Sequence, residues 1–563
     1  MKLFYTPLLT VKRGILLLLC FIAVSMYQQL YAQVTTSSIT GIIIDENKEP
    51  VIGANVVAVH TPSGSTYGTV TNVDGRFTIP SMRIGGPYTI TTSYTGYESD
   101  ILDNIYLSLG TPASFNITLH EANIELGNVI VTADRNDVFT SGRTGAANNI
   151  TTQQLNSLPT LNRSFIDFAR LTPQASTASF GTSFGGQDNR MNNTTIDGSL
   201  LNNSFGLTGE PGGRTAISPI SLDAIEEVQV NLAPYDVRQA GFVGAGINAV
   251  TRSGTNKIQG SVFYDFRNES LAGTKAGDVT FNKNLNKFDV KQYGFRLGGP
   301  LVKNKLFFFI NAELERQANP YLDQSNLGSE EVAGNKTRVL KSDLENVSSF
   351  VKENFGYETG IFENYDLATT GDKYLVKLDW NLSDKHRLSL RFNRLQSASD
   401  ILTSNSNSLG FGNRRNNRDA MAFRNSNYIQ NDNISSGILE LNSIFGTKMS
   451  NNFIAGYTFQ REDRGSYGET FPLIEIQKEA KTYITLGSEP FTPSNKLNYK
   501  TYQLQDNLSI YLNKHTITAG ISLERLEFVN VFFPGSQGVF VYNSLEDFYT
   551  DLQDAKDNPG RDT

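Results

Sequence analysis

Apolar and polar residues alternate with a period of two through much of the second half of the chain. In residues 258–267, Ile258, Val262, Tyr264 and Phe266 share one side, while the other side is mostly polar. The same alternation recurs in residues 292–297, 306–315, 374–380, 388–392, 439–441, 453–459, 504–510 and 517–523. A transmembrane β-barrel needs such strands, because lipid covers its outer face and water wets its lumen. The pattern therefore predicts antiparallel barrel strands.

Short and long connections alternate between these segments. The short connections are residues 298–305, 381–386, 446–451 and 513–515. The long connections, residues 319–370, 397–433 and 461–498, are polar and rich in Asn. Because outer-membrane barrels keep periplasmic turns short and extracellular loops long, we expect the long stretches to face outside. One of them should contain a helix, since apolar residues recur at helical spacing after the capping-box sequence at residues 342–345.

Shorter strand signals separated by turns fill residues 38–119. They lie at residues 39–44, 51–59, 66–70, 76–79, 88–94 and 114–119, a spacing that predicts a small β-sandwich. The strings GIIIDENKEPVIGANVVAV, TNVDGRFTIP and YTITTSYTGYES resemble the carboxypeptidase regulatory-like domain, a transthyretin-like fold. The resemblance implies no peptidase, because the four histidines lack zinc-ligand spacing with a glutamate.

The first 32 residues have the features of a signal peptide. Lys2, Lys12 and Arg13 supply positive charge, residues 15–24 form a short apolar core, and Ala32 precedes a plausible cleavage point. The chain is therefore expected to be exported. Cys20, the only cysteine, lies inside that core after Leu19, where a lipoprotein signal would have a small residue. The mature chain should then have no thiol for disulfides, metal binding or catalysis.

Composition narrows the class of protein. The net charge of −7 and the lack of any Lys/Arg block argue against nucleic acid as a partner. No apolar run beyond the first thirty residues approaches the ~20 residues of a spanning helix. Plentiful aromatic residues, 35 Phe and 24 Tyr, suit membrane strands, although a soluble all-β array would look similar.

Residues 225–256, IEEVQVNLAPYDVRQAGFVGAGINAVTRSGTN, lead directly into the first barrel-type strand. Gly244 and Gly246 leave little side chain between Phe242 and Ile247, so another backbone can approach, and we expect these glycines to pack with Arg252 against the barrel wall. The string resembles the end of the plug domain of TonB-dependent outer-membrane receptors, where it joins the plug to the first strand. The alternative is a Gly-rich strand of a soluble β domain.

Residues 140–224 are expected to form the body of the plug. Residues 163–171 suggest a short amphipathic helix with Phe165, Phe168, Ala169 and Leu171 on one side. Asp197 and Gly198 form a turn within NNTTIDGSLLNNSFG, which, with GGPLVKNKLFFF, resembles the Oar-like subgroup of these receptors. Asp and Asn side chains there could instead hold a cation, but turn formation explains them better.

An isolated β-prone stretch, LGNVIVTA, precedes a polar run at residues 134–149. A tethered strand of this kind can complete a partner's sheet by β-augmentation. The stretch resembles a TonB box, which would assign the contact with TonB to Val129, Ile130, Val131, Thr132 and Ala133. The alternative is that it forms the last strand of the sandwich or the first strand of the plug.

The resulting expectation is an all-β-dominated protein in five parts. These are a signal peptide (1–32), a transthyretin-like β-sandwich (33–120), a candidate TonB box and tether (125–137), an α+β plug domain (138–256) and a partial transmembrane antiparallel β-barrel (257–563). About nine strands are recognisable, whereas the barrels of this family have about 22. We therefore expect the N-terminal part of a longer receptor.

The resemblance implies transport across the outer membrane, surrounded by outer-membrane lipid. TonB, working with ExbB and ExbD, would pull on the box to open the plug for an unidentified substrate, for example an oligosaccharide, a peptide or a protein. The alternative is a non-transporting adhesion or scaffold protein with the same architecture. An enzyme has almost no support, since no nucleophile elbow, P-loop, metal constellation or cofactor motif is present.

Overall fold

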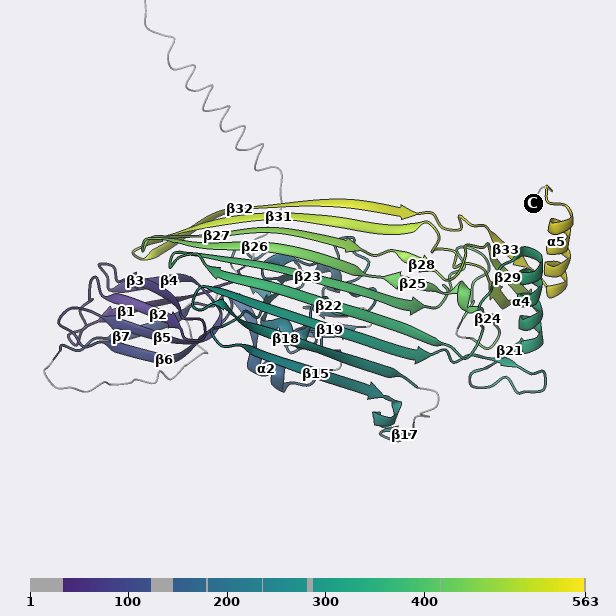
Figure 1. The fold of residues 1–563 in the computed structure, drawn as a ribbon, viewed down its shortest axis with the longest axis horizontal. Helices are drawn as coiled ribbons and strands as arrows, with labels where there is room; N and C mark the ends of the chain where they lie inside the picture. The colour runs from purple at the N-terminus through teal and green to yellow at the C-terminus, as the bar shows by residue number, and fades with distance from the viewer. Residues whose placement is uncertain are drawn as a thin grey trace, which may run out of the picture.

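The computed structural model describes residues 34–122, 145–160, 162–178, 181–234, 236–280, 287–415 and 417–560. Within them the chain forms a β-sandwich, a plug, a broad sheet of long strands and a cap built from loops (Figure 1). The sandwich lies at one end of the long strands and the cap at the other, with the plug against the concave side of the sheet. No helix in these residues is long and apolar enough to cross a membrane.

The sandwich consists of two small sheets with one core. One sheet has the order β4 (Arg76–Met82), β1 (Ser37–Ile44), β7 (Ala113–Thr118), and the other β3 (Ser65–Val70), β2 (Asn55–His60), β5 (Gly85–Ser93), β6 (Asp100–Leu107). Side chains alternate between buried and exposed along β3, as a half-buried strand requires. The core includes Ile39, Val56, Phe77, Tyr88 and Ile90. The predicted sandwich is confirmed.

Strand β6 was not predicted. Its sequence, DILDNIYL, carries Asp and Asn residues, and Asn104 adopts the left-handed conformation with φ 60°. The register between β5 and β6 shifts in the same region. An irregularity of this kind breaks the period-two pattern that identifies a strand in a sequence.

The plug contains a five-stranded sheet. Its order is β12 (Ser199–Leu200), β11 (Asn193–Ile196), β14 (Gly246–Thr251), β13 (Ile225–Pro234), β8 (Gly145–Thr151). Around it lie α2 (Thr152–Ser157), α3 (Ile166–Ala169), the hairpin of β9 (Ala175–Ala178) and β10 (Gly181–Phe184), and the 3-10 turns η2 (Asn189–Met191) and η3 (Leu222–Ala224). Helix α3 is shorter than predicted; Phe165, Phe168 and Ala169 are buried as expected, but Leu171 is exposed.

The core of the plug continues into the wall of the barrel. Buried plug residues such as Val228 and Ile247 belong to one apolar cluster with Phe309, Leu375 and Leu395 from the long strands. Apolar contacts of this kind hold the plug beside the wall without a covalent link other than the chain itself.

Nine long antiparallel strands form the main path of the barrel sheet in the described residues. They are β15 (Gln259–Asn268), β18 (Asp289–Val302), β19 (Leu306–Pro320), β22 (Asp366–Asn381), β23 (His386–Ile401), β26 (Asn433–Phe445), β27 (Met449–Arg461), β31 (Asn495–Leu512) and β32 (His515–Phe532). The short strands β25 (Tyr428–Asn431) and β28 (Arg464–Ser466) extend this sheet, and β16 (Lys275–Ala276) pairs with β17 (Val279–Thr280) after the short turn η4 (Glu269–Leu271). Strands β15 and β32 are its two edges there, so the sheet is open.

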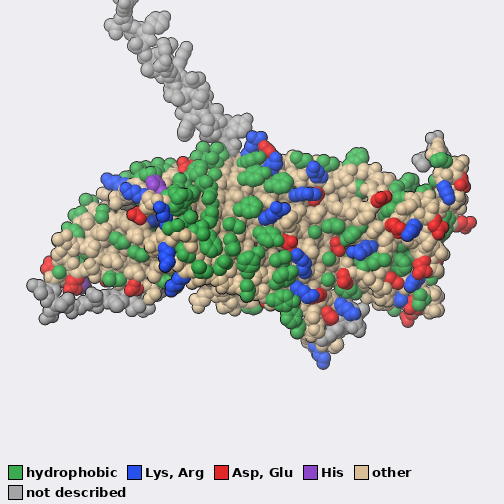
Figure 2. Space-filling model, viewed as in Figure 1, with side chains coloured by type: hydrophobic (Ala, Val, Ile, Leu, Met, Phe, Trp, Pro, Cys, Tyr) green, Lys and Arg blue, Asp and Glu red, His purple; other side chains and the backbone are tan. Residues whose placement is uncertain are grey.

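The convex face of this sheet carries an apolar band. Val262, Tyr264 and Phe266 are 83%, 58% and 55% exposed, as the predicted lipid face requires. Hydrophobic side chains gather in a band across the long strands on the half nearer the sandwich (Figure 2). The opposite face of the strands carries buried polar and charged side chains directed towards the plug.

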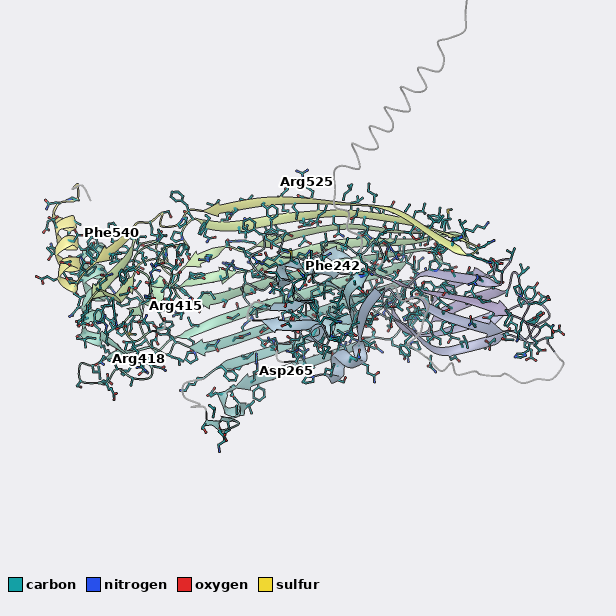
Figure 3. All side chains as sticks on the ribbon, turned by 180° about the vertical axis from the view of Figure 1, so that it is seen from behind. Phe242, Asp265, Arg415, Arg418, Arg525 and Phe540 are labelled. Carbon is teal, nitrogen blue, oxygen red and sulfur yellow. The ribbon has the colours of Figure 1, made fainter. Side chains whose placement is uncertain are left out.

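The long loops fold together into a cap with its own core. Its sheet has the order β24 (Met421–Ala422), β30 (Lys481–Leu486), β29 (Leu473–Lys478), β33 (Val539–Tyr542), accompanied by α4 (Lys341–Phe355), α5 (Leu545–Asp557), the pair β20 (Gln324–Asn326) and β21 (Lys336–Leu340), and the turn η6 (Arg424–Ser426). Figure 3 places Arg415, Arg418 and Phe540 at this end of the molecule. Val339, Ile476 and Phe548 meet in the core.

The predicted loop helix is confirmed as α4, but its predicted capping box is wrong. The helix begins two residues earlier, with Leu340 in place of Ser342 as its N-cap and no side-chain cap. It ends at Gly356, whose φ of 68° only glycine adopts at low cost.

Candidate functional site

The turn between β11 and β12 fixes the plug to the barrel wall through a buried carboxylate. Asp197 and Gly198 both have positive φ, at 47° and 78°, as a tight two-residue turn requires. The Asp197 carboxylate lies 3.6 Å from the Lys377 ammonium and 3.4 Å from the Arg391 guanidinium. It also accepts hydrogen bonds from the backbone N–H (2.8 Å) and hydroxyl (2.6 Å) of Thr251.

The charges in this cluster favour the ionised form of Asp197. Burial alone would raise the pKa of this carboxyl, but the neighbouring ammonium of Lys377 and guanidinium of Arg391 outweigh burial and hold the pKa below its ordinary value. The predicted turn residue is therefore also an ion-pair partner for two barrel strands, β22 and β23. No cation is needed to explain its position.

Polar contacts extend along the same turn. The Gly198 carbonyl accepts from the side-chain amide of Gln503 at 2.8 Å, and the Leu200 N–H donates to the same side chain at 3.0 Å. The Ser199 and Ser436 hydroxyls are 3.2 Å apart. Polar contacts from four barrel strands, β22, β23, β26 and β31, thus converge on one plug turn.

A second polar contact joins the plug to β19 and β22. Glu313, which is fully buried, accepts from the Lys373 ammonium at 2.7 Å and from the Ser221 hydroxyl of the plug at 2.6 Å. Nearby, the Arg163 guanidinium pairs with Asp223 at 3.0 Å and with Asp265 of β15 at 3.1 Å. Plug and wall are therefore held by charge-assisted hydrogen bonds, which are strong where water is excluded.

The expectation that Gly244 and Gly246 pack against the barrel wall is wrong. A Cβ at Gly246 would meet the ring of Phe242 at 2.8 Å, and the space at Gly244 is filled by Asn192, so both glycines face the plug itself. Arg252 likewise donates to the Ile225 carbonyl at 3.1 Å and lies 3.8 Å from Glu226.

At Gly254 the backbone of the barrel wall lies directly against the plug segment. A Cβ there would collide with the Phe308 carbonyl and would lie 2.7 Å from the Gly299 carbonyl. Both carbonyls belong to the hairpin of β18 and β19, so any side chain would displace backbone. The physical argument for a close approach was correct, but it applies eight residues further along the chain.

The predicted TonB box, Val129 to Ala133, lies outside the described residues. Of the other predicted site residues, the structure brings only Asp197 and Gly198 into the plug–barrel contact.

Buried charged side chains that the sequence did not single out join the plug to β25 and to the neighbouring long strands. Arg214 of the plug donates to Gln430 at 2.5 Å and, through its backbone N–H, to Asp432 at 3.2 Å. Glu462 accepts from Asn203 at 2.8 Å and from the Tyr499 hydroxyl at 2.6 Å. In the pairs that join plug to barrel, Arg214 with Gln430 or Asp432 and Asn203 with Glu462, the two partners are more than 200 residues apart in the sequence. No local signal could therefore have identified them.

Several buried polar atoms in this region have no hydrogen-bond partner in the described structure. They include one carboxylate oxygen each of Asp432, Glu462 and Glu489 and the Nε of Arg464. Burial lowers the pKa of Arg214, against the opposing effect of the Glu462 carboxylate. The described residues contain no group of three His, Cys, Asp or Glu side chains suited to hold a metal ion.

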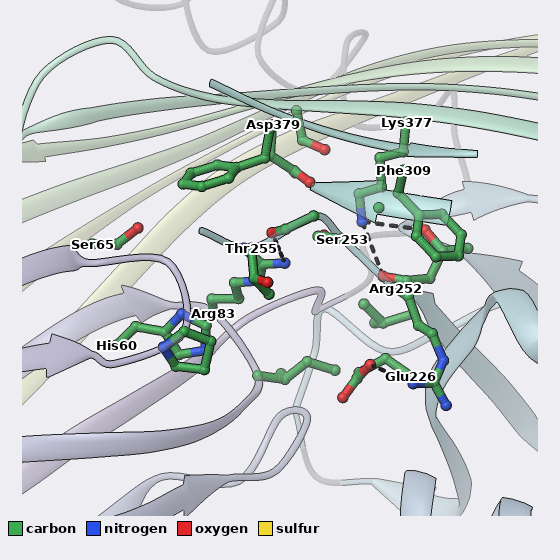
Figure 4. A pocket seen from close by; sticks show the side chains of 18 of the residues that line it. His60, Ser65, Arg83, Glu226, Arg252, Ser253, Thr255, Phe309, Lys377 and Asp379 are labelled. Atoms are coloured by element: carbon green, nitrogen blue, oxygen red, sulfur yellow. Dashed lines mark hydrogen bonds and ion pairs between the residues drawn. The ribbon is translucent and has the colours of Figure 1, made fainter. Parts of the chain in front are cut away.

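A cavity of about 880 Å³ lies on the other side of the plug, between the plug, the wall and the sandwich. His60 and Arg83 line it from the sandwich, Arg252 from the plug, and Lys377 and Asp379 from the wall (Figure 4). The pKa of His60 is lowered to about 3, first by burial and then by the positive charge of Arg83, so this imidazole is neutral at physiological pH.

Comparisons with known proteins agree with this architecture. Residues 38–120 match the family model of the carboxypeptidase regulatory-like domain. Residues 250–342 and 337–561, more than half of the chain, match that of the outer membrane beta barrel domain.

Two curated relatives are TonB-dependent proteins. The chain is 28% identical over 290 residues to the TonB-dependent transporter Oar of Myxococcus xanthus, covering 49% of this chain and 26% of Oar. It is 26% identical over 266 residues to the TonB-dependent receptor SusC of Bacteroides thetaiotaomicron, covering 45% of this chain and 24% of SusC. The matches thus span about a quarter of the length of each relative.

Among solved structures, the outer membrane transporter YddB of Escherichia coli is 13% identical, with a TM-score of 0.47, over 68% of this chain and 48% of YddB. The siderophore receptor PirA of Pseudomonas aeruginosa is 12% identical, with a TM-score of 0.41, over 68% of this chain and 48% of PirA. The family models and the curated relatives carry the assignment. The chain belongs to the outer membrane beta barrel family, carries an N-terminal carboxypeptidase regulatory-like domain, and is similar to the TonB-dependent proteins Oar and SusC.

Proposed function

We propose that this receptor takes up a polar substrate through the barrel lumen, using energy relayed by TonB. The observation that carries the proposal is the way the plug is held. Its contacts with the wall are ion pairs and hydrogen bonds, centred on Asp197 and Glu313, together with an apolar cluster. Such contacts can be broken and remade, so a pulling force on the plug could open a path.

The capture site in this proposal lies between the cap and the plug. Arg214, Asp432 and Glu462 lie there, and one carboxylate oxygen each of Asp432 and Glu462 is buried without a hydrogen-bond partner. A polar ligand satisfies such groups, whereas an apolar one would leave them buried and unpaired. This supports a substrate class rich in hydroxyl or amide groups, such as an oligosaccharide or a peptide.

The energy-coupling contact in this proposal is Val129, Ile130, Val131, Thr132 and Ala133. The relatives Oar and SusC are described as a TonB-dependent transporter and a TonB-dependent receptor, which supports this contact. A free β-prone segment can add as a strand to a partner's sheet, and TonB, with ExbB and ExbD, is the proposed partner. The proposal keeps the five-part division of the chain, with the box and tether at residues 125–137 between the sandwich and the plug.

The test is binding of the periplasmic part of TonB to the purified full-length receptor. Ile130→Pro removes a backbone donor and should weaken binding at least about tenfold, because strand addition depends on main-chain hydrogen bonds. Asn136→Pro, in the polar tether, is the matched control and should bind as the wild type does. Wild-type binding by the Ile130→Pro variant would contradict the box assignment and would favour an adhesion or scaffold role.

A further inference from the structure

The sandwich is docked onto the short-turn end of the barrel. The Asn381 side-chain amide donates to the Ser65 hydroxyl at 2.9 Å, and the Arg387 guanidinium donates to the Thr66 carbonyl at 2.7 Å. The same guanidinium lies over the ring of Tyr67, 3.8 Å from its centroid. Asn381 and Arg387 flank the short connection between β22 and β23.

The sandwich also contacts the plug directly. The Leu109 N–H donates to the Glu227 carboxylate at 3.0 Å, and the Leu109 carbonyl accepts from Gln229 at 2.6 Å. The Asn256 N–H, at the plug–barrel junction, donates to the Pro62 carbonyl at 2.8 Å. One face of the sandwich therefore touches both the plug and the rim of the barrel.

The residues ahead of the sandwich reach into the lumen. The Val34 carbonyl accepts from the side-chain amide of plug residue Asn248 at 2.6 Å, and the Thr35 hydroxyl donates to the carboxylate of Glu440 in β26. A Cβ at Gly198 would lie 3.1 Å from the Thr35 methyl group, so this segment also touches the Asp197 turn. A displacement of the plug turn would disturb the anchor of the sandwich.

We propose that the sandwich is a second gate, which closes the end of the barrel lumen opposite the cap and must leave its docked position before the lumen opens. A substrate that passes the plug meets the sandwich next, because the 880 Å³ cavity beyond the plug is bounded by the sandwich. The docking contacts are mainly hydrogen bonds, which is typical of interfaces between domains that move relative to each other. The gate is additional to the TonB-driven plug movement proposed above.

Disulfide cross-linking tests whether the docked position exists. The sequence has one cysteine, in the predicted signal peptide, so introduced pairs meet no other thiol within it. Full-length receptor carrying Ser65→Cys and Asn381→Cys should cross-link under mild oxidation. The control pair Lys48→Cys with Asn381→Cys should not cross-link. Strand β1 starts beside the barrel, where Thr35 contacts β26, and Lys48 follows the opposite, C-terminal end of β1. Absence of a cross-link in the first pair would overturn the proposal.

Thiol labelling tests whether docking closes the lumen. Ser389 lines the cavity behind the sandwich, and Ser389→Cys is labelled with a maleimide-coupled polyethylene glycol too large for the cavity. Labelling should be slow in the docked receptor and about tenfold faster when Asn381→Ala and Arg387→Ala remove the docking hydrogen bonds. Asn381→Arg, which places a second cation beside Arg387, is an alternative if that double variant folds poorly. Equal rates in docked and undocked receptors, with the cross-link formed, would show that the sandwich docks without closing the lumen and would refute the gate.

Discussion

Asp197→Asn is the most direct test of how the plug is held. The change conserves size, and asparagine adopts the left-handed conformation more readily than most residues, so the turn can persist. The amide can still accept from Thr251, but it cannot neutralise Lys377 and Arg391. The substitution therefore isolates the contribution of one negative charge.

The expected effect is a loss of about 3–5 kcal/mol of plug–barrel stability, because removing one partner of a buried ion pair leaves an uncompensated charge. The upper part of this range applies, since two cations share the Asp197 carboxylate and its side chain is 8% exposed. The lowered pKa of Asp197 means that this stability is fully present above the unfolded pKa of about 4 and is lost as pH falls towards the folded pKa. A measurement at neutral pH thus reports the whole effect.

The assay is urea-induced release of the plug in purified full-length receptor, followed by its susceptibility to protease. Asp188→Asn is the matched control, because Asp188 lies in the same domain but pairs with Arg190 on the surface, where ion pairs contribute little. Adding Lys377→Met to Asp197→Asn should recover part of the loss. If the plug of the Asp197→Asn variant is released at the same urea concentration as that of the wild type, the ion pairs of Asp197 with Lys377 and Arg391 do not stabilise the plug–barrel contact.

Three further predictions concern other parts of the molecule. Gly254→Ala should destabilise the plug–barrel junction by roughly 1–3 kcal/mol in the same urea assay, whereas Gly246→Ala should cost less, because the ring of Phe242 can move and backbone carbonyls cannot. His60 is neutral in the folded sandwich, whereas its imidazole binds a proton in the unfolded chain below about pH 6.5. Acidification from about pH 7 to about pH 5 should therefore lower the unfolding free energy of the sandwich by about 2 kcal/mol. Thermal unfolding of the His60→Gln variant should lack this pH dependence. An epitope after Gly328 should bind antibody on intact cells and one after Lys303 should not; the reverse would invert the topology.

The sandwich and the barrel sheet were predictable because their signals are local. In β15 the apolar residues occupy alternate positions, and the structure exposes them on the lipid side as the pattern requires. The short connection at residues 303–305 likewise joins β18 to β19. A period of two and a turn need only neighbouring residues to be recognised.

The cap was not predictable in the same way. Its core joins Val339, Met421, Ile476 and Phe548, which come from four separate segments. Each segment carries too few apolar residues to form a core alone, and the surrounding Asn-rich sequence is typical of irregular loops. Two cap helices are long enough to show a period of their own: α4 was predicted, whereas α5, with apolar residues at helical spacing after its N-cap Ser544, was missed.

The plug contact shows where reasoning from the sequence ends. The Asp197-Gly198 pair identifies a turn because the preference for positive φ belongs to those two residues. The ion pairs of Asp197 depend on Lys377 and Arg391, each about 180 or more residues away, and on the position of the plug relative to β22 and β23. For the same reason the sequence could indicate that a glycine meets a wall, but not that the glycine is Gly254. A local preference fixes the shape of the turn, whereas its partners depend on the register between two domains.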